Sequence, residues 1–594
     1  MLHSHIFHRK ALWLALTSLI ALLASCNKDF LEKEPFDKLV PSTFFNKKED
    51  LELYTNSFYQ KMMPDGLSVV IADEMGDYTS KSNSPAFIAG NFTPVDQARW
   101  SWTDLRNINY FLKRSNNPAI DQQVRNHYKG VARFFRAWFY FEKVKTYGDV
   151  PWYSKPLDVN DTEELYKPRD PRTLVMDSVL ADLNFAAANI EDVKDNTASK
   201  VTRQVALAFQ SRVCLFEGTF RKYHTELNLG NTADSWLQAA AEAAKKVIDS
   251  KKYSLYSTGV PDKDYRTLFT SENPVSQEIL WAVVYNNSLK RWHDITWKFS
   301  SATYGARWGL NKQFVNTYLN RDGSRFTDID GSDTMRFVRE VTGRDPRLSQ
   351  TIRGIGYKRS DGSAAPPNFG YTFTGYQILK FSLDDKRLDG AAESYNSVPL
   401  IRYAEVLLNY AEAVAELGLM NSDPAIWSRT IGELRKRAGV KTDPPVSADP
   451  YLQQVYFSGI NDKYLLEVRR ERGIELIYEG FRYADLLRWK KGRLLEMQWK
   501  GIYVAAKNVL MDLDGNSSPD VCFVDAVPQT KVPGVIYYVI DNRAARLTEG
   551  NKGFVTWRDD EKRSFEDKKY YRPIANSDIV DNGNLKQNPG WEQQ

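Results

Sequence analysis

Apolar residues recur at three- and four-residue steps over several long stretches of the chain, the pattern of amphipathic helices. Gly148 and Pro151 lie where they would end the longest of these stretches. The predicted helices cover residues 44–63, 121–147, 171–187, 202–217, 234–249, 401–418, 424–437, 461–478 and 481–490. The pattern therefore predicts a mainly α protein.

The later predicted helices form antiparallel pairs, 401–418 with 424–437 and 461–478 with 481–490. Each pair has about the length of a tetratricopeptide unit, roughly 34 residues, and such units stack into a solenoid. Between the helices lie long polar stretches without clear periodicity, and loops of this length are usually functional.

We therefore predict one body, residues 26–594, in which a tetratricopeptide-like helical-hairpin scaffold carries an irregular, loop-rich insertion subdomain. The scaffold is predicted over about 40–285 and 400–490, and the loop-rich insertions over about 285–400 and 495–594.

The first 25 residues read as a lipoprotein signal peptide. A basic beginning is followed by an apolar run over residues 11–24 that is too short to span a bilayer. The run ends in Ala24-Ser25-Cys26, which fits the cleavage site of bacterial lipoproteins. We predict that Cys26 carries acyl chains and anchors an exported protein to a membrane.

The charge balance excludes a nucleic-acid partner. The chain has 80 Lys and Arg against 75 Asp and Glu, and removing Arg9 and Lys10 with the signal peptide leaves 78 − 75 = +3. A body of this size with so small a net charge lacks the basic surface that binds phosphates. Of the remaining cysteines, Cys214 lies in an apolar helical stretch and is predicted to be a buried thiol, although a disulfide with Cys522 stays open.

A charged run near residues 467–489 invites a catalytic interpretation. Three glutamates four residues apart share one helix face in this run: Glu471, Glu475 and Glu479. Three nearby arginines can bridge them: Arg472, Arg482 and Arg488. Carboxylates held ionised by arginines are poor proton donors, so we predict a structural ion-pair network rather than acid–base catalysis.

Motifs for metals and nucleotides are absent from the sequence. Asp512-Leu513-Asp514-Gly515-Asn516 hints at a calcium loop, but its glycine is fourth rather than sixth and Phe523 stands where the closing glutamate belongs. A plain turn is the preferred interpretation, and neither a metal nor a cofactor is expected.

Trp, Tyr and Phe make up 13% of the residues, and one cluster of them is interspersed with polar groups. Aromatic faces that stack on sugar rings, with polar side chains nearby to bond hydroxyls, are what a glycan site needs. The predicted ligand-binding residues in this cluster are Trp292, Trp297, Tyr304, Arg307 and Trp308, and a second group adds Asp73, Tyr78 and Trp100. Trp102 begins a helical pattern and is predicted to lie in the core.

Several segments, in order along the chain, resemble one family, the SusD/RagB nutrient-binding outer-membrane lipoproteins of Bacteroidetes. The most specific is Arg469-Arg470-Glu471-Arg472-Gly473 running into Glu479-Gly480-Phe481-Arg482-Tyr483. The matching segments are residues 26–31, 132–141, 147–151, 345–348, 401–413, 468–476 and 479–489.

The resemblance implies a lipid-anchored protein on the outer membrane, facing the medium. It also implies a partner, a SusC-like TonB-dependent transporter, and a ligand, an oligosaccharide or polysaccharide captured for import without catalysis. Because some relatives bind peptides, a peptide ligand stays open, and a surface glycoside hydrolase is the remaining alternative. The matching segments belong to the scaffold, so no binding residue is transferred from the family.

Overall fold

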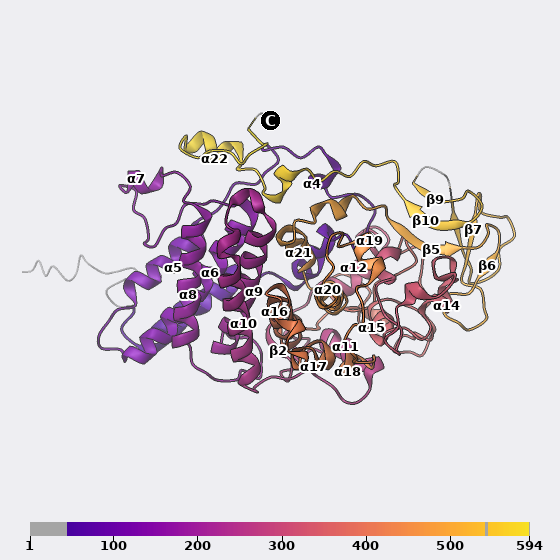
Figure 1. The fold of residues 1–594 in the computed structure, drawn as a ribbon, viewed down its shortest axis with the longest axis horizontal. Helices are drawn as coiled ribbons and strands as arrows, with labels where there is room; N and C mark the ends of the chain where they lie inside the picture. The colour runs from indigo at the N-terminus through magenta and orange to yellow at the C-terminus, as the bar shows by residue number, and fades with distance from the viewer. Residues whose placement is uncertain (1–43, 541–543, 593–594) are drawn as a thin grey trace, which may run out of the picture.

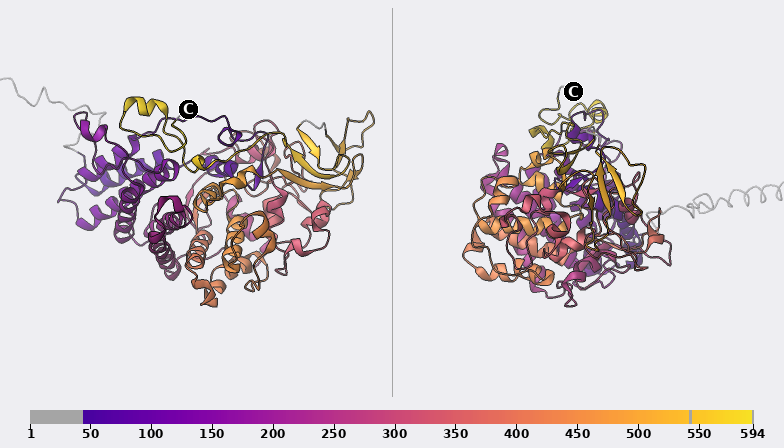
Figure 2. Two further views of the ribbon diagram at one scale, coloured as in Figure 1. Left: turned by 45° about the horizontal axis from the view of Figure 1, so that its top comes forward. Right: turned by 90° about the vertical axis from the view of Figure 1, so that its right-hand side faces the viewer.

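The computed structural model describes residues 44–540 and 544–592, so the predicted signal peptide and Cys26 lie outside the described residues. Helices dominate the part that is described, which confirms the mainly α prediction. Long helices occupy one half of the molecule, and most strands gather at the far end (Figures 1 and 2).

The long helices follow the predicted pattern, with ends that shift by a few residues. The predicted helix over 424–437 is split in two around Arg429 and Thr430. The scaffold helices are α2 (Lys48–Met62), α5 (Thr103–Arg114), α6 (Gln122–Tyr147), α8 (Arg172–Asn189), α9 (Arg203–Tyr223), α10 (Ala233–Asp249), α16 (Tyr403–Glu416), α17 (Pro424–Ser428), α18 (Ile431–Ala438), α20 (Lys463–Leu476) and α21 (Arg482–Arg488).

These helices pack in sequence order into a curved array (Figure 1). Helices α2 and α5 contact α6, and the contacts continue from α6 to α8, α9, α10, α16 and α20. Small residues permit the close approach of α9 and α10. A Cβ atom at Gly218 would lie only 2.9 Å from Leu237 Cγ.

The remaining elements are short helices and small sheets, most of them in the other half of the molecule, although α7 and α22 lie with the long helices (Figure 1). Strand β2 (Ile279–Val283) pairs antiparallel with β4 (Val398–Arg402), which brings the two ends of the 285–400 segment together. The shorter helices are α3 (Gly66–Ile71), α4 (Ala86–Ala89), α7 (Thr162–Leu165), α11 (Pro261–Thr270), α12 (Ile295–Ser300), α13 (Lys312–Val315), α14 (Phe337–Val341), α15 (Pro346–Thr351), α19 (Pro450–Val455) and α22 (Asn576–Asp581).

The other strands are two to five residues long. Strand β1 (Thr79–Ser80) pairs with β3 (Gly309–Leu310). Two three-stranded sheets close the far end, in the orders β5-β10-β9 and β6-β7-β8, with β7 and β8 parallel. These strands are β5 (Lys500–Val504), β6 (Leu510–Met511), β7 (Val521–Val524), β8 (Ile536–Val539), β9 (Ala545–Leu547) and β10 (Gly553–Trp557).

Two large apolar clusters lie in the interior, one among the scaffold helices and one beneath the irregular half. Met63, Leu400 and Ile460 pack against both clusters, so the two cores are continuous through them. Cys214 and Cys522 are buried and unpaired, as predicted for Cys214. Among the described residues, no helix is long and apolar enough to cross a membrane.

Candidate functional site

The predicted aromatic segment folds around α12. Trp292, Trp297 and Tyr304 are all half-buried, so each residue keeps part of its area at the surface. The rings of Trp297 and Tyr304 stack nearly parallel, with centroids 3.8 Å apart and planes at 11°. We call Trp292, Trp297, Tyr304 and Arg307 the candidate face.

Hydrogen bonds to a neighbouring loop hold this segment in place. The Tyr304 hydroxyl donates to Asp294 Oδ2 at 3.4 Å, and Asp294 Oδ1 accepts the Ala392 N–H at 2.6 Å. His293 and Ser394 exchange two backbone bonds, at 2.8 and 3.1 Å. The stacked rings therefore sit on a braced support, which reduces the ordering cost of ligand binding.

Arg307 is half-buried and belongs to a layered stack that the sequence pattern did not indicate. Its guanidinium lies 5.1 Å from the ring centroid of Phe373, which stacks on Trp557 with centroids 3.6 Å apart. The Trp557 indole donates to the backbone oxygen of Ser82 at 3.2 Å. Trp557 is half-buried and joins the β10 strand to the candidate face.

The structure corrects the prediction for Trp308, because this side chain is only 2% exposed. Its ring packs with Phe299 and Tyr478, at centroid distances of 6.2 and 5.9 Å. Trp308 therefore fills the core beneath α12 and is not available to a ligand.

Asp73 and Tyr78 are corrected in the same way. Tyr78 is 3% exposed, with the Phe314 ring 3.7 Å away on one side and the Arg482 guanidinium 3.8 Å from its centroid. Asp73 is 1% exposed and accepts the backbone N–H groups of Tyr478 and Arg482. Both residues fasten the first irregular segment to the turn between α20 and α21.

Trp100 lies on a different surface. It borders a groove of about 730 Å³ at the N-terminal end of α5, together with Trp102 and Tyr153. Trp102, predicted to lie in the core, is half-buried and contributes its ring to the same groove. Figure 1 places α5 and α12 in different halves of the molecule.

The glutamates of the charged run form a buried ion-pair network, as predicted. Glu475 is bonded by Arg347 at 2.9 Å and Arg402 at 2.7 Å, and Arg437 also pairs with it. Burial alone would raise the pKa of Glu475, but these three guanidinium groups together lower it well below its usual value. Glu475 is therefore held as a carboxylate and is unsuited to donate protons.

The partners in this network differ from those predicted. Glu471 pairs with Arg347 and Arg435, and Glu479, which lies beyond the end of α20, pairs with Lys380 and Arg402. The predicted arginines bind other carboxylates. Arg472 contacts Asp485, Arg482 contacts Asp77, and Arg488 contacts Glu412 and Asp485.

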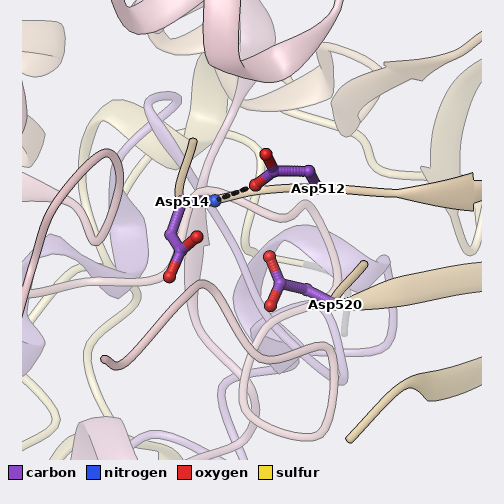
Figure 3. A group of neighbouring side chains, drawn as sticks. All are labelled: Asp512, Asp514 and Asp520. Carbon is purple, nitrogen blue, oxygen red and sulfur yellow. Dashed lines mark hydrogen bonds between the residues drawn. The ribbon is translucent and has the colours of Figure 1, made fainter. Parts of the chain in front are cut away.

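The turn after β6 gathers three carboxylates, Asp512, Asp514 and Asp520, whose oxygens lie within 4.8 Å of one another (Figure 3). The same oxygens accept backbone N–H groups of the turn. Asp512 Oδ1 accepts from Asp514 and Gly515, at 3.0 and 2.7 Å. Burial and the neighbouring acids raise the pKa of Asp520 to about 6. The hydrogen bonds agree with the turn predicted for residues 512–516.

His293 makes the support of the candidate face sensitive to acid. The side chain is 7% exposed, donates from Nε2 to the Asn396 backbone oxygen at 2.8 Å and accepts the Ile295 N–H at Nδ1. Burial lowers its pKa from 6.5 to about 4. Between pH 6.5 and pH 4 the His293 imidazole is protonated in the unfolded chain but neutral in the folded chain. The free energy of unfolding therefore falls as the pH drops from 6.5 to 4.

We expect this residue to contribute about 3 kcal/mol to the loss of unfolding free energy between pH 7 and pH 4. The His293→Gln variant keeps an Nε2-type donor but does not titrate, so its stability should change less over the same range. Urea unfolding of both proteins at several pH values measures the difference. Parallel pH profiles would contradict the assignment.

Two family models match the chain. The model described as the SusD family matches residues 277–591, and the model described as starch-binding associating with outer membrane matches residues 29–215. Among curated relatives, SusD-like protein P2 of Formosa agariphila is 24% identical over 509 residues, 80% of this chain and 90% of that protein. A SusD-like protein of Bacteroides ovatus is 22% identical over 537 residues, 85% of this chain and 88% of that protein.

Solved structures share the fold. A SusD-like protein from Bacteroides fragilis superposes with a TM-score of 0.67 at 20% identity and covers 94% of this chain and 100% of its own. A SusD-like carbohydrate binding protein from the same species superposes with a TM-score of 0.64 at 21% identity and covers 92% and 100%. The SusD family model alone spans more than half of the 594 residues. The chain belongs to the SusD family.

Proposed function

We propose that this protein captures glycans at the surface of the outer membrane, without catalysis, for import through a SusC-like TonB-dependent transporter. Acyl chains on Cys26, which lies outside the described residues, would hold it there. The observation that carries the proposal is the half-buried stack of Trp297 on Tyr304, braced through Asp294 on the loop at Ala392. Flat rings with polar neighbours suit the C–H faces and hydroxyls of sugars.

The polar groups of the candidate face support this ligand class. The Trp292 indole N–H bonds the exposed side chain of Asn287 at 3.0 Å, an acceptor that a hydroxyl can share or replace. The Lys298 ammonium lies 5.1 Å from the Tyr304 ring centroid and donates to the Tyr304 backbone oxygen at 3.3 Å. Burial lowers the pKa of Lys298, and its side chain is a polar group close to the stacked rings.

Binding without catalysis is supported by the state of the buried carboxylates. The carboxylates of α20 pair with arginines. Burial alone would raise the pKa of Glu471, but Arg347 and Arg435 lower it below its usual value. These carboxylates also lie in the interior, away from the candidate face.

The purified full-length lipoprotein should bind at least one member of a hexasaccharide panel in isothermal titration. The panel contains maltohexaose, xylohexaose, laminarihexaose and hexagalacturonate, and chromatography of the same mixtures reports any cleavage. Binding without cleavage is the expected result. A lack of binding to every member of the panel, or peptides retained on the purified protein, would contradict a glycan ligand. Cleavage products in the mixtures would contradict the absence of catalysis.

A further inference from the structure

The groove beside Trp100 is built from three segments that are far apart in the sequence. Residues 99–109 at the start of α5, the connection 151–166 and the region of α22 line its cavity of about 730 Å³. This volume lies in the usual range of small-molecule sites, about 300–1,000 Å³. From its architecture and chemistry, we infer that this groove is a second glycan-binding site, separate from the candidate face.

Buried polar contacts fix one wall of the groove. Asn109 is 1% exposed and donates from Nδ2 to the backbone oxygens of Tyr153 and Lys155, at 2.8 and 3.3 Å. Arg136 donates to Asn109 Oδ1 at 3.1 Å and pairs with Asp182 at 2.7 Å. The position of Tyr153 is therefore set before any ligand arrives.

The opposite wall is fixed by ion pairs to α22. Arg99 bonds Asp578 at 3.0 Å and also pairs with Asp581, and the Trp100 backbone N–H donates to Asp578 Oδ2 at 3.1 Å. Asp578 is 5% exposed, whereas the Arg99 side chain is 58% exposed, so the link is buried only on the α22 side. Helix α22 thus closes the groove with residues from the far C-terminal end of the chain.

The lining combines aromatic rings with unused hydrogen-bond donors. The rings of Trp100 and Trp102 meet at 5.4 Å, and Trp102 meets Tyr153 at 5.4 Å. Within the described chain, neither indole N–H nor the Tyr153 hydroxyl forms a hydrogen bond, although all three residues line the cavity. Arg106 is exposed and donates a long hydrogen bond from Nε to the Leu157 oxygen at 3.4 Å. Rings beside free donors are the complement of a sugar's C–H faces and hydroxyl oxygens.

Exposed valines at the edge of the groove add apolar surface that an oligosaccharide could contact. Val95 and Val159 are 75% and 82% exposed. Val95 is close to α22, because the Asn576 N–H bonds the Pro94 oxygen, and Val159 lines the cavity. None of the described residues that line the groove belongs to a β-strand, so an extended peptide finds no strand edge with which to pair. This excludes recognition by strand addition, whereas the aromatic rings and free donors of the lining suit a glycan.

A second site changes how the protein holds a polymer. The groove lies with α5 and α22 in one half of the molecule and the candidate face with α12 in the other (Figure 1). A polysaccharide that reaches both would bind the second site intramolecularly, which raises avidity without new contacts. That the ligand is a glycan rests on the proposed function, whereas the location of the second site rests on the groove itself.

The test compares Trp100→Ala and Arg106→Ala with Trp297→Ala in the full-length lipoprotein. Each is titrated with the hexasaccharides of the panel and with the corresponding polysaccharides. We expect two hexasaccharides per wild-type molecule, one in each single variant at Trp100 or Trp297, and none when both are replaced. Arg106→Ala, which removes an exposed side chain, should weaken one of the two sites at least fivefold while the protein stays folded.

The outcomes separate the two claims. If Trp297→Ala abolishes binding and both groove variants keep wild-type stoichiometry and affinity, the groove inference falls and the proposed function stands. If the wild type binds no glycan, both fall. If the groove variants alone lose a peptide that copurifies with the wild type, the groove is a peptide site and the inference is overturned. Circular dichroism of each variant confirms that the helices remain folded.

Discussion

Replacing Arg402 with alanine should lower the free energy of unfolding by about 3–5 kcal/mol. The guanidinium is 1% exposed and bonds Glu278 at 2.9 Å, Glu475 at 2.7 Å and Glu479 at 2.7 Å. Its removal leaves buried carboxylates short of counter-charge, which costs far more than the pair itself contributes.

Arg387→Ala is the matched control. This arginine also pairs with a carboxylate, Asp385, but its side chain is 88% exposed, so its loss should change stability by less than about 0.5 kcal/mol. Denaturant titration followed by circular dichroism measures both variants. A change below 1 kcal/mol for Arg402→Ala would show that the network does not hold the scaffold together.

Trp297→Ala should weaken glycan binding at the candidate face about 30-fold or more and leave the groove occupied, since aromatic anchors typically carry about 2 kcal/mol or more of binding energy. The substitution removes one of the two stacked rings and leaves Tyr304 without its partner at 3.8 Å. Tyr304→Phe keeps the ring, loses only the 3.4 Å bond to Asp294 and should bind nearly as well as the wild type.

Trp308→Phe is the control for this prediction. Trp308 is close in sequence but buried, so its replacement should lower the melting temperature and leave the affinity unchanged. Titration calorimetry with the best hexasaccharide of the panel measures all three variants. Equal losses for Trp297→Ala and Trp308→Phe would mean that stability, not contact with the sugar, explains the effect.

The scaffold could be predicted from the sequence because helical periodicity is a local property. Helix α6, for example, ends at Tyr147, next to the glycine that was expected to stop it. Ion-pair partners are not local. Arg347 and Arg402 lie 128 and 73 residues from Glu475, so no spacing rule within the charged run could select them over Arg472.

The candidate site was predictable only in part for the same reason. The aromatic segment was found from its composition, but composition does not say which rings turn inward. Trp308 is buried by contacts with Tyr478, a residue far along the chain, whereas Trp297 on α12 keeps part of its area at the surface. Trp557 was missed because it lies about 250 residues away and joins the site through Phe373.

The buried network also constrains the order in which the chain can fold. Its charges come from positions as distant as Glu278 and Arg437, which are 159 residues apart, and Glu475 joins them later still. Synthesis from the N-terminus delivers four of its arginines, Arg347, Arg402, Arg435 and Arg437, before the glutamates of α20 that they share. Long-range contacts of this kind make folding slow. The network is thus complete only once α20 is made, because a polypeptide that stops before α20 leaves Arg347 with Asp345 alone and leaves Arg402 and Arg437 to share Glu278.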